Sequence, residues 1–308
     1  MRSSRPDRSA LRDSQVNDGA IVATEIATVR SILGLDDDTS VEFDDSGWDS
    51  RVYLVSGGVA VFKFARNDIA VQQYEHEIAA LGLLESQGGA EVVVPRVRWV
   101  DDDRRWFGYE GIVGPSLVAA LPTLSAARRR EIGTAIGRFL AELHAMSLPN
   151  APICSIDADI ENYANKLALS SPALEAEFNA AERARIESFV LDTLATGLRA
   201  QPVRLALAHG DLGPWNVVVG SQGDRDGVGI IDFGDVGYHD PAIDFAGRID
   251  ATILDAALDA YDADDALRER AFLRARALPV LDIPFYLGKG DAVGLRTRLD
   301  EIRVELLA

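Results

Sequence analysis

Cysteine is almost absent from this chain of 308 residues, which contains only Cys154. One thiol cannot form an internal disulfide or a cysteine metal site, so the composition fits a reducing compartment and predicts a cytoplasmic protein. Long apolar runs are also absent. No stretch approaches the roughly 20 residues needed to cross a bilayer, so we expect no membrane partner. The polar segment from Met1 to Gly19 lacks the apolar stretch of a secretion signal, and we expect residues 1–18 to form a disordered tail.

Basic residues are scarce relative to acidic ones: 31 Lys and Arg stand against 49 Asp and Glu, a formal net charge of -18. Such a surface repels polyanions and attracts polycations over about a Debye length, ~8–10 Å in physiological salt. We therefore expect no nucleic-acid partner. An acidic surface that only maintains solubility is the simpler interpretation of the charge taken alone.

The apolar pattern predicts an α+β protein with a sheet-rich first part. Helical spacing precedes two alternating apolar runs that flank Ser56-Gly57-Gly58, which is typical of a β-hairpin. Another helix and two more strands follow. The expected elements are a helix at 22–33, hairpin strands at 51–55 and 59–64, a helix near 71–81, and strands at 92–100 and 106–110.

From about Leu124 the pattern is helical, apart from a second hairpin at 217–219 and 228–231 with a turn rich in Gly and Asp. We therefore expect a small antiparallel-sheet N-lobe with one helix and a larger helical C-lobe. The expected boundaries are 19–110 for the N-lobe, 111–114 for a hinge and 115–308 for the C-lobe.

The strongest chemical signal is His209-Gly-Asp-Leu-Gly-Pro-Trp-Asn216, followed by Ile230-Ile-Asp-Phe-Gly234. Phosphoryl transfer needs a carboxylate to receive the proton of the acceptor hydroxyl, and oxygen ligands for the magnesium that bridges the phosphates. Asp211, Asn216 and Asp232 are residues of these types. One loop can direct the first two into a common cleft, and the hairpin returns the third beside them. Each motif alone is weak, because Asp and Asn in loops usually serve turns.

The two motifs, in this order and spacing, resemble those of the aminoglycoside phosphotransferase family, which has a protein-kinase-like fold. The resemblance covers roughly residues 40–280. It implies that Asp211 is the catalytic base, that Asn216 and Asp232 hold Mg²⁺, and that ATP or GTP donates the phosphate. It also implies a small cationic acceptor of the aminoglycoside type and hence antibiotic resistance.

The segment from Asp232 to Phe245 is similar to the branch that includes aminoglycoside 2″-phosphotransferases. By that likeness, Asp240 and Asp244 brace the catalytic loops. The resemblance says less about the acceptor, because sibling families phosphorylate macrolides, choline, fructosamines or sugars.

The N-lobe carries a candidate nucleotide site. Lys63 ends an alternating strand, and Glu77 shares the inward face of the following helix, where a charge needs a partner. An exposed lysine and a glutamate at a helix edge would explain the same pattern. The resemblance implies that these two residues pair and that the lysine reaches the phosphates.

Three further positions complete the expected nucleotide site. No glycine-rich phosphate loop is present, only the turn from Ser46 to Ser50, whose backbone N–H groups and Ser50 hydroxyl could face phosphate. The resemblance places the nucleotide base against the backbone of the segment 109–114, at the Glu110 carbonyl and the Ile112 amide.

An acidic run after the second motif is the candidate acceptor site. Six Asp residues lie between Asp250 and Asp265, with no Lys or Arg among them. A bound polyamine sugar would neutralise them, although a solvated helix face explains them equally well. The resemblance points to Asp250, and Asp157 belongs to a second acidic segment. The expected acceptor-binding residues are Asp250, Asp255 and Asp157.

Two alternatives remain open at this stage. One is a kinase for a macrolide or another hydroxylated metabolite, and the other is a nucleotide-binding pseudokinase that regulates a partner. The pseudokinase is disfavoured because every expected catalytic and metal-binding residue is present. The sequence does not indicate an oligomeric state.

Overall fold

The computed structural model describes residues 8–45, 47, 49–87, 91–220 and 227–308, with side chains described from residue 19 onward. The chain divides into two compact units, one of Met1–Gly82 with Pro95–Val113 and one of Leu83–Val94 with Gly114–Ala308. The second division falls inside the expected hinge, 111–114. Leu83–Val94 groups with the second unit, rather than with the expected N-lobe, because β4 (Val92–Val93) pairs in parallel with β9 (Val228–Ile230).

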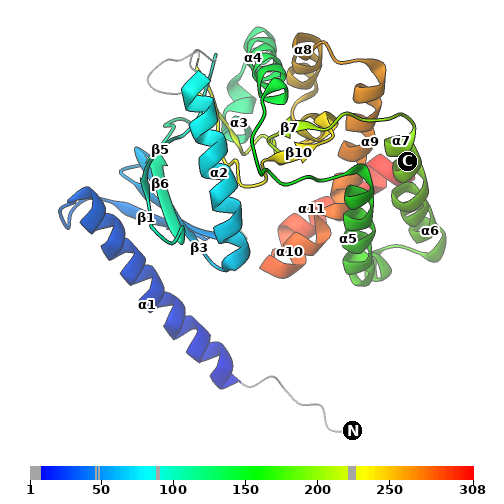
Figure 1. The fold of residues 1–308 in the computed structure, drawn as a ribbon. Coiled ribbons are helices and arrows are strands. Elements are labelled where there is room, and N and C mark those ends of the chain that lie inside the picture. Colours follow the sequence, from blue (N-terminus) through cyan, green and yellow to red (C-terminus); the bar gives the residue numbers. More distant parts are fainter. Residues whose placement is uncertain (1–7, 46, 48, 88–90, 221–226) are drawn as a thin grey trace. The chain divides into compact units, whose positions relative to one another are not determined.

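The first unit contains an antiparallel sheet of five strands in the order β1-β2-β3-β6-β5 (Figure 1). The predicted hairpin is confirmed, with positive φ at Ser56, Gly57 and Gly58 in its turn. The prediction of a single strand at 92–100 is wrong. Pro95, which has no N–H to donate, separates β4 from β5. The strands are β1 (Val41–Asp44), β2 (Ser50–Val55), β3 (Ala60–Ala65), β5 (Arg96–Val100) and β6 (Trp106–Glu110).

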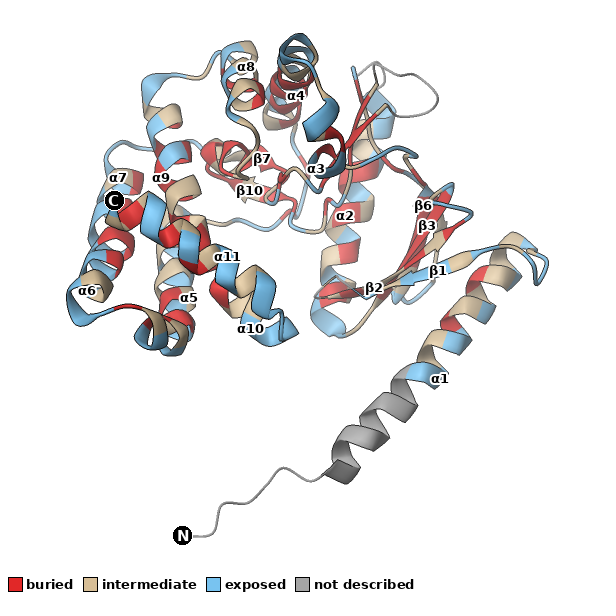
Figure 2. Cartoon of the chain, turned by 180° about the vertical axis from the view of Figure 1, so that it is seen from behind, coloured by how far each residue is buried: buried red, intermediate tan, exposed pale blue. Residues whose placement is uncertain are grey.

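Two helices pack against this sheet, α1 (Arg8–Leu33) and α2 (Asp68–Gln87). Because side chains alternate along β3, Phe62 packs in a cluster with Val29 of α1, whereas Val61 packs with Tyr74 of α2. Helix α1 begins inside the expected tail, 1–18. The residues from Arg8 to Asn17 include good helix formers such as Ala, Leu, Arg and Gln. Figure 2 shows the buried strands of this sheet in red.

The second unit is mainly helical, as expected, and holds two small sheets. One has the order β4-β9-β8, and the other pairs β10 with β7. Its strands are β7 (Ala206–Ala208), β8 (Val217–Val219), β9 and β10 (Gly237–His239). The predicted second hairpin is confirmed as β8 and β9, with Val217 opposite Ile230. Most of its expected turn, 221–226, lies outside the described residues.

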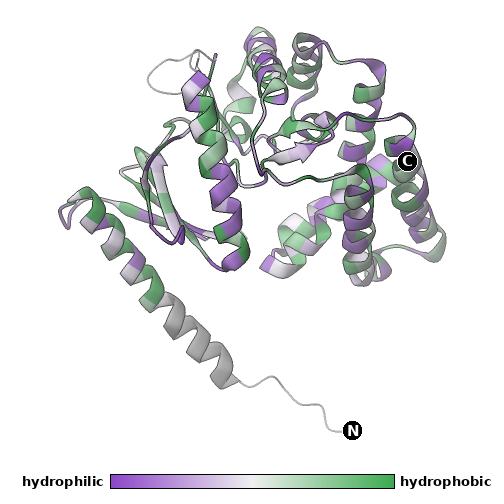
Figure 3. Cartoon of the chain, viewed as in Figure 1, coloured by the Kyte–Doolittle hydropathy of each residue, from purple (hydrophilic) through white to green (hydrophobic). Residues whose placement is uncertain are grey.

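The longer helices of the second unit are α4 (Ala126–Ala145), α5 (Ile156–Glu177), α6 (Ala180–Ser188), α8 (Ala251–Tyr261), α9 (Asp265–Leu281) and α11 (Ala292–Ile302). The shorter helical segments are α3 (Leu117–Ala120), η1 (Leu121–Thr123), η2 (Phe189–Leu194), α7 (Ala195–Arg199), η4 (Pro241–Phe245), α10 (Ile283–Lys289) and η5 (Arg303–Leu307). Figure 3 shows hydrophilic and hydrophobic residues interspersed along α5 and α6. Among the described helices, none is long and apolar enough to cross a bilayer.

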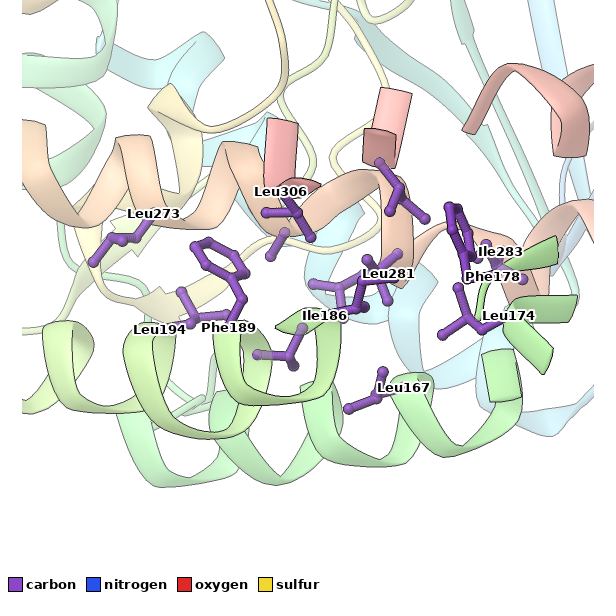
Figure 4. Close-up of a cluster of buried hydrophobic side chains, with 14 of the residues drawn as sticks. Leu167, Leu174, Phe178, Ile186, Phe189, Leu194, Leu273, Leu281, Ile283 and Leu306 are labelled. Carbon is purple, nitrogen blue, oxygen red and sulfur yellow. The ribbon is translucent and has the colours of Figure 1, made fainter. Parts of the chain in front are cut away.

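The core at one end of this unit joins α5, α6, η2, α9, α11 and η5. Its buried side chains include Leu167, Leu174, Ile186, Phe189, Leu281 and Leu306 (Figure 4). Elsewhere α4 lies close against α8, and glycines on α4 permit this approach. A Cβ on Gly133 would lie 2.2 Å from the carbonyl oxygen of Ile253, and a Cβ on Gly137 would lie 2.2 Å from that of Ala257. Across this contact, His144 of α4 lies 2.8 Å from the Tyr261 hydroxyl of α8.

Candidate active site

The loop between β7 and β8, which carries the first motif, is held by a buried carboxylate. Asp244 Oδ2 accepts the backbone N–H of His209 at 2.8 Å, and Oδ1 accepts that of Gly210 at 2.9 Å. Gly210 has a φ of 88°, and a Cβ there would lie 2.3 Å from the carbonyl oxygen of Asp235. Only glycine therefore fits directly before Asp211.

Asp244 is itself held by a residue that the sequence interpretation missed. His144 on α4 places Nε2 3.0 Å from Asp244 Oδ2 and Nδ1 2.8 Å from the Tyr261 hydroxyl on α8. Burial opposes ionisation of Asp244, but the hydrogen bond from His144 and the backbone N–H groups hold its pKa below the usual value. The apolar stripe of α4 predicts the helix, but a stripe does not indicate that the histidine at its end has an ionised partner.

Within the loop, the Asn216 side chain is oriented by Asp211. Its Nδ2 donates to the backbone oxygen of Asp211 at 2.9 Å and lies 3.4 Å from Oδ2 of the same residue. The amide nitrogen thus points into the loop, which leaves the Oδ1 oxygen as the atom that can face a metal ion. His209 contacts the carbonyl oxygen of Ile231 through Nε2 at 3.0 Å and so ties this loop to the residue before Asp232.

Asp232 follows β9, and strand register brings it beside the loop: Ile231 donates its backbone N–H to the Asn216 carbonyl at 3.0 Å. Its φ of 67° is unusual for a residue other than glycine. Such conformations concentrate at functional sites, where surrounding structure holds them. The residue that the motif marks thus also has an unusual backbone conformation.

The Asp211 carboxylate lies in a negative environment. Part of the residue is open to solvent, but desolvation of the carboxylate, followed by the charges of Asp235 and Asp232, raises its pKa to about 6. The His209 ring and a hydrogen bond from the Trp215 side chain act in the opposite direction. A carboxylate with such a pKa can accept a proton near neutral pH. The sequence interpretation did not single out Asp235 or Trp215.

The donor set fits Mg²⁺. Among the described residues, no three His, Cys, Asp or Glu side chains form a metal cluster. Mg²⁺ bound with a nucleotide needs fewer, because phosphates and water supply most of its ligands and the protein adds one or two hard oxygens. The carboxylate of Asp232 and Oδ1 of Asn216 are oxygens of this kind. These two residues would hold the ion.

In the first unit, Lys63 and Glu77 form the expected pair. Lys63 Nζ lies 2.7 Å from Oε2 and 3.0 Å from Oε1 of Glu77, and both side chains are buried. The ammonium group also lies 5.9 Å from the centroid of Tyr74 and 5.8 Å from that of Phe107. The ion pair thus fixes the strand lysine against α2.

The other expected nucleotide-site residues lie in different settings. Ser50 is buried, and its Oγ accepts the Tyr74 hydroxyl at 2.7 Å, so this side chain joins β2 to α2. Ser46 and Trp48 of the expected phosphate turn lie outside the described residues. Glu110 ends β6 with its side chain paired to Arg98 at 3.0 Å, and Ile112 is half-buried in the segment after it.

The acidic run is largely engaged within the second unit. Asp250 caps α8 through the backbone N–H of Thr252 and pairs with Arg129 at 2.9 Å, whereas Asp255 is exposed. Asp259 pairs with Arg268 at 2.7 Å. Asp262 ends α8 in the left-handed conformation, and Asp264 caps α9. The absence of Lys and Arg inside the run was misleading, because its cations come from other segments.

The second acidic segment is also paired. The exposed Asp157 carboxylate lies 2.7 Å from Arg199, while the buried Asp159 lies 2.7 Å from Arg274. Arg274 also contacts Asp240, which receives two hydrogen bonds from Arg270. The expectation that Asp240 is structural is thus consistent with a buried network between η4, α5 and α9.

Comparisons with known proteins agree with this geometry. A family model described as the phosphotransferase enzyme family matches residues 40–278. A comparison with curated proteins gave no match. Among solved structures, the complex of APH(2″)-IIIa with GDP and kanamycin has a TM-score of 0.69 at 20% identity, covering 92% of this chain and 98% of that one.

Two further solved structures are similar. The gentamicin complex of APH(2″)-IIa has a TM-score of 0.67 at 18% identity, covering 91% of this chain and 95% of that one. The macrolide 2′-phosphotransferase of Brachybacterium faecium has a TM-score of 0.60 at 20% identity, covering 90% and 97%. At such identities the likeness establishes the fold, which is α+β and kinase-like. With more than half of its length matched by the family model, the chain belongs to the phosphotransferase enzyme family and is a phosphotransferase.

Proposed function

We propose that this phosphotransferase moves the γ-phosphate of ATP or GTP onto a hydroxyl of an aminoglycoside in the cytoplasm, and so confers resistance to the drug. The observation that carries the proposal is that Asp211 and Asn216 lie on one loop braced by Asp244, with Asp232 beside that loop. It combines a carboxylate of raised pKa with two hard oxygen donors.

Asp211 takes the role of general base. It accepts the proton of the acceptor hydroxyl as the oxygen attacks the γ-phosphorus and the bond to the β-phosphate oxygen breaks. Bound Mg²⁺ would neutralise charge on the phosphates, with Asn216 and Asp232 as its protein ligands. The Asn216 amide, tied to the base, keeps the metal ligand and the base in a fixed relation.

Lys63 takes the role of the cation for the α- and β-phosphates. Its pair with Glu77 directs the ammonium group and holds it in a buried setting, where a charge acts more strongly than in water. The Glu110 carbonyl and the Ile112 amide remain the proposed contacts of the nucleotide base. Ser50 also remains a proposed phosphate contact, because its hydroxyl accepts the hydrogen of Tyr74 and keeps its own hydrogen to donate.

A cationic acceptor is supported by the net charge of -18 and by the carboxylates around Asp211. Two similar structures are described as complexes with kanamycin and gentamicin. A macrolide is the second candidate acceptor, because an enzyme described as a macrolide 2′-phosphotransferase shares the fold.

The test is phosphate transfer from ATP and GTP to kanamycin, gentamicin, a macrolide, choline and a neutral sugar, each at two ionic strengths. We expect transfer to an aminoglycoside, with an acceptor KM that rises with salt because exposed charges are screened. Asp211→Asn is the inactive control. Transfer to the macrolide or the neutral sugar alone, without salt dependence, would reject the proposed acceptor and retain the phosphotransferase.

A further inference from the structure

An exposed tryptophan lies in the catalytic loop. Trp215 immediately precedes Asn216 and is 48% exposed, although large aromatic side chains are usually buried. A solitary exposed aromatic residue needs no explanation on a remote surface. This one lies four residues from the proposed base, inside the loop that also carries the proposed metal ligand Asn216.

The indole is held from one side by the loop itself. A Cβ on Gly213 would lie 2.4 Å from Cε2 and Cζ2 of Trp215, so the ring rests directly on the Gly213 backbone. Gly213 cannot recede, because a Cβ on Gly247 would lie 1.9 Å from the Leu212 carbonyl oxygen and 3.0 Å from Gly213 Cα. The loop is therefore packed from beneath, and the ring lies against Gly213 on one side while the residue as a whole is half exposed. We call the face of the ring away from Gly213 its open face.

The edge of the indole is fixed as well. Its N–H donates to the Asp211 carboxylate, and the turn beneath it is closed by two backbone hydrogen bonds of 3.0 Å, from Gly213 to the Asp211 carbonyl and from Asn216 to the Gly213 carbonyl. The open face of the ring thus has a defined position relative to the base. The carboxylates of Asp211, Asp232 and Asp235 give this region a negative charge.

A tryptophan face beside carboxylates favours one kind of ligand. Of the aromatic side chains, tryptophan attracts cations most strongly, and it also offers a flat apolar surface to a ring. We propose that the open face of Trp215 binds the amine-bearing sugar ring of the acceptor and presents the hydroxyl of that ring to Asp211. This inference rests on the proposed function and moves acceptor recognition from the engaged acids of α8 to the catalytic loop.

The test compares two substitutions that both remove the indole N–H. Trp215→Phe keeps an aromatic face, and Trp215→Leu does not. Because both variants lack the hydrogen bond to Asp211, the difference between their kinetic constants reports the effect of the aromatic face alone. We expect similar kcat values in the two variants and an acceptor KM about three- to 30-fold higher with Leu than with Phe. The nucleotide KM should agree within about twofold, since the face contacts only the acceptor. Phe272→Leu, which removes an exposed aromatic residue of α9, is the matched control with wild-type kinetics.

Equal acceptor KM values in the Phe and Leu variants would overturn the inference and leave Trp215 as an anchor of the base. An analogue with hydroxyls in place of the amines should show a smaller Phe-to-Leu ratio, and an unchanged ratio would reject the cationic part. If Trp215→Leu does not fold, as judged by thermal unfolding, Trp215→Met supplies a second flexible, non-aromatic side chain.

Phosphate transfer by the wild-type protein distinguishes a failure of the proposed function from a failure of this inference. No transfer to any aminoglycoside rejects the proposed acceptor before any variant is compared. The same variants are then measured with the macrolide, whose amino sugar also carries a cation, and equal KM values there overturn the inference too. If wild type transfers phosphate to neither acceptor, both are rejected.

Discussion

His144 Nε2 lies 3.0 Å from Asp244 Oδ2, and the two side chains are only 4% and 0% exposed. An ionised carboxylate can only accept, so Nε2 must carry the hydrogen, and in the neutral ring Nδ1 accepts the Tyr261 hydroxyl. Asp244 in turn receives the backbone N–H groups that precede the proposed base. One carboxylate thus links side chains of two helices to the loop that carries Asp211.

Asp244→Ala should lower the free energy of unfolding by about 3–5 kcal/mol at neutral pH, because it leaves buried donors without a partner. Folding lowers the pKa of Asp244, so its contribution is present above the unfolded value near 3.9 and fades as the pH falls below it. Urea unfolding of wild type and variant between pH 7 and pH 3 measures this. A difference that grows in acid would contradict the assignment.

Asp211→Asn should reduce turnover about 10²–10⁴-fold, the usual contribution of a general base, while nucleotide binding persists. The variant should be at least as stable as wild type at neutral pH, because folding raises the pKa of Asp211 and so disfavours its charged form. Single-turnover kinetics, nucleotide titration and thermal unfolding test the three parts. Turnover within about threefold of wild type would reject Asp211 as the base.

Asp235→Asn should lower the pKa of Asp211, because it removes a neighbouring negative charge. In the metal-free protein, the fluorescence of Trp215, which donates to Asp211, should titrate near pH 6 in wild type and at a lower pH in the variant. Asp211→Asn is the control and should abolish this transition. An unchanged midpoint in Asp235→Asn would show that Asp235 does not contribute to the raised pKa of Asp211.

Asp232→Ala and Lys63→Ala should separate two contributions to nucleotide binding. The first should abolish the dependence of nucleotide affinity on magnesium, because Asp232 is the proposed carboxylate ligand. The second should raise the nucleotide KM and lower kcat while the magnesium dependence remains, because Lys63 contacts phosphates directly. Calorimetric titration of the nucleotide with and without Mg²⁺ measures both. The same magnesium response with and without Asp232 would exclude that residue as a ligand.

The parts of the site that could be predicted from sequence are local. The loop with Asp211 and Asn216 and the hairpin before Asp232 carry their own motifs, and Glu77 follows from helix phase. The expectations for Ser50 and Asp250 stay predictions, and both side chains have partners distant in sequence that local patterns did not indicate. Arg129 lies 121 residues from Asp250, and Tyr74 lies 24 residues from Ser50. A local pattern cannot show whether such a side chain is already engaged.

The predictions of strands that were wrong or incomplete have a different cause. Val92–Val100 is continuously β-favouring apart from Pro95, and only the tertiary pairing of β4 with β9 shows that the residues before the proline join another sheet. The short strands β7 and β10 were missed because three residues give too little periodicity. Their pairing helps to position the loop that carries Asp211, since His209 directly follows β7.

The last prediction compares two acidic residues of α8. Asp250 caps the helix and pairs with Arg129, whereas Asp255 is exposed. Asp250→Ala removes a helix cap and the partner of Arg129, so the free energy of unfolding should fall by about 1–2 kcal/mol. Asp255→Ala removes an exposed charge and should change stability by less than about 0.5 kcal/mol. If α8 still contributes to acceptor binding, Asp255→Ala alone raises the acceptor KM at unchanged stability. An acceptor KM that rises in Asp250→Ala and not in Asp255→Ala, under conditions where both variants are fully folded, would support Asp250 as a direct ligand of the acceptor.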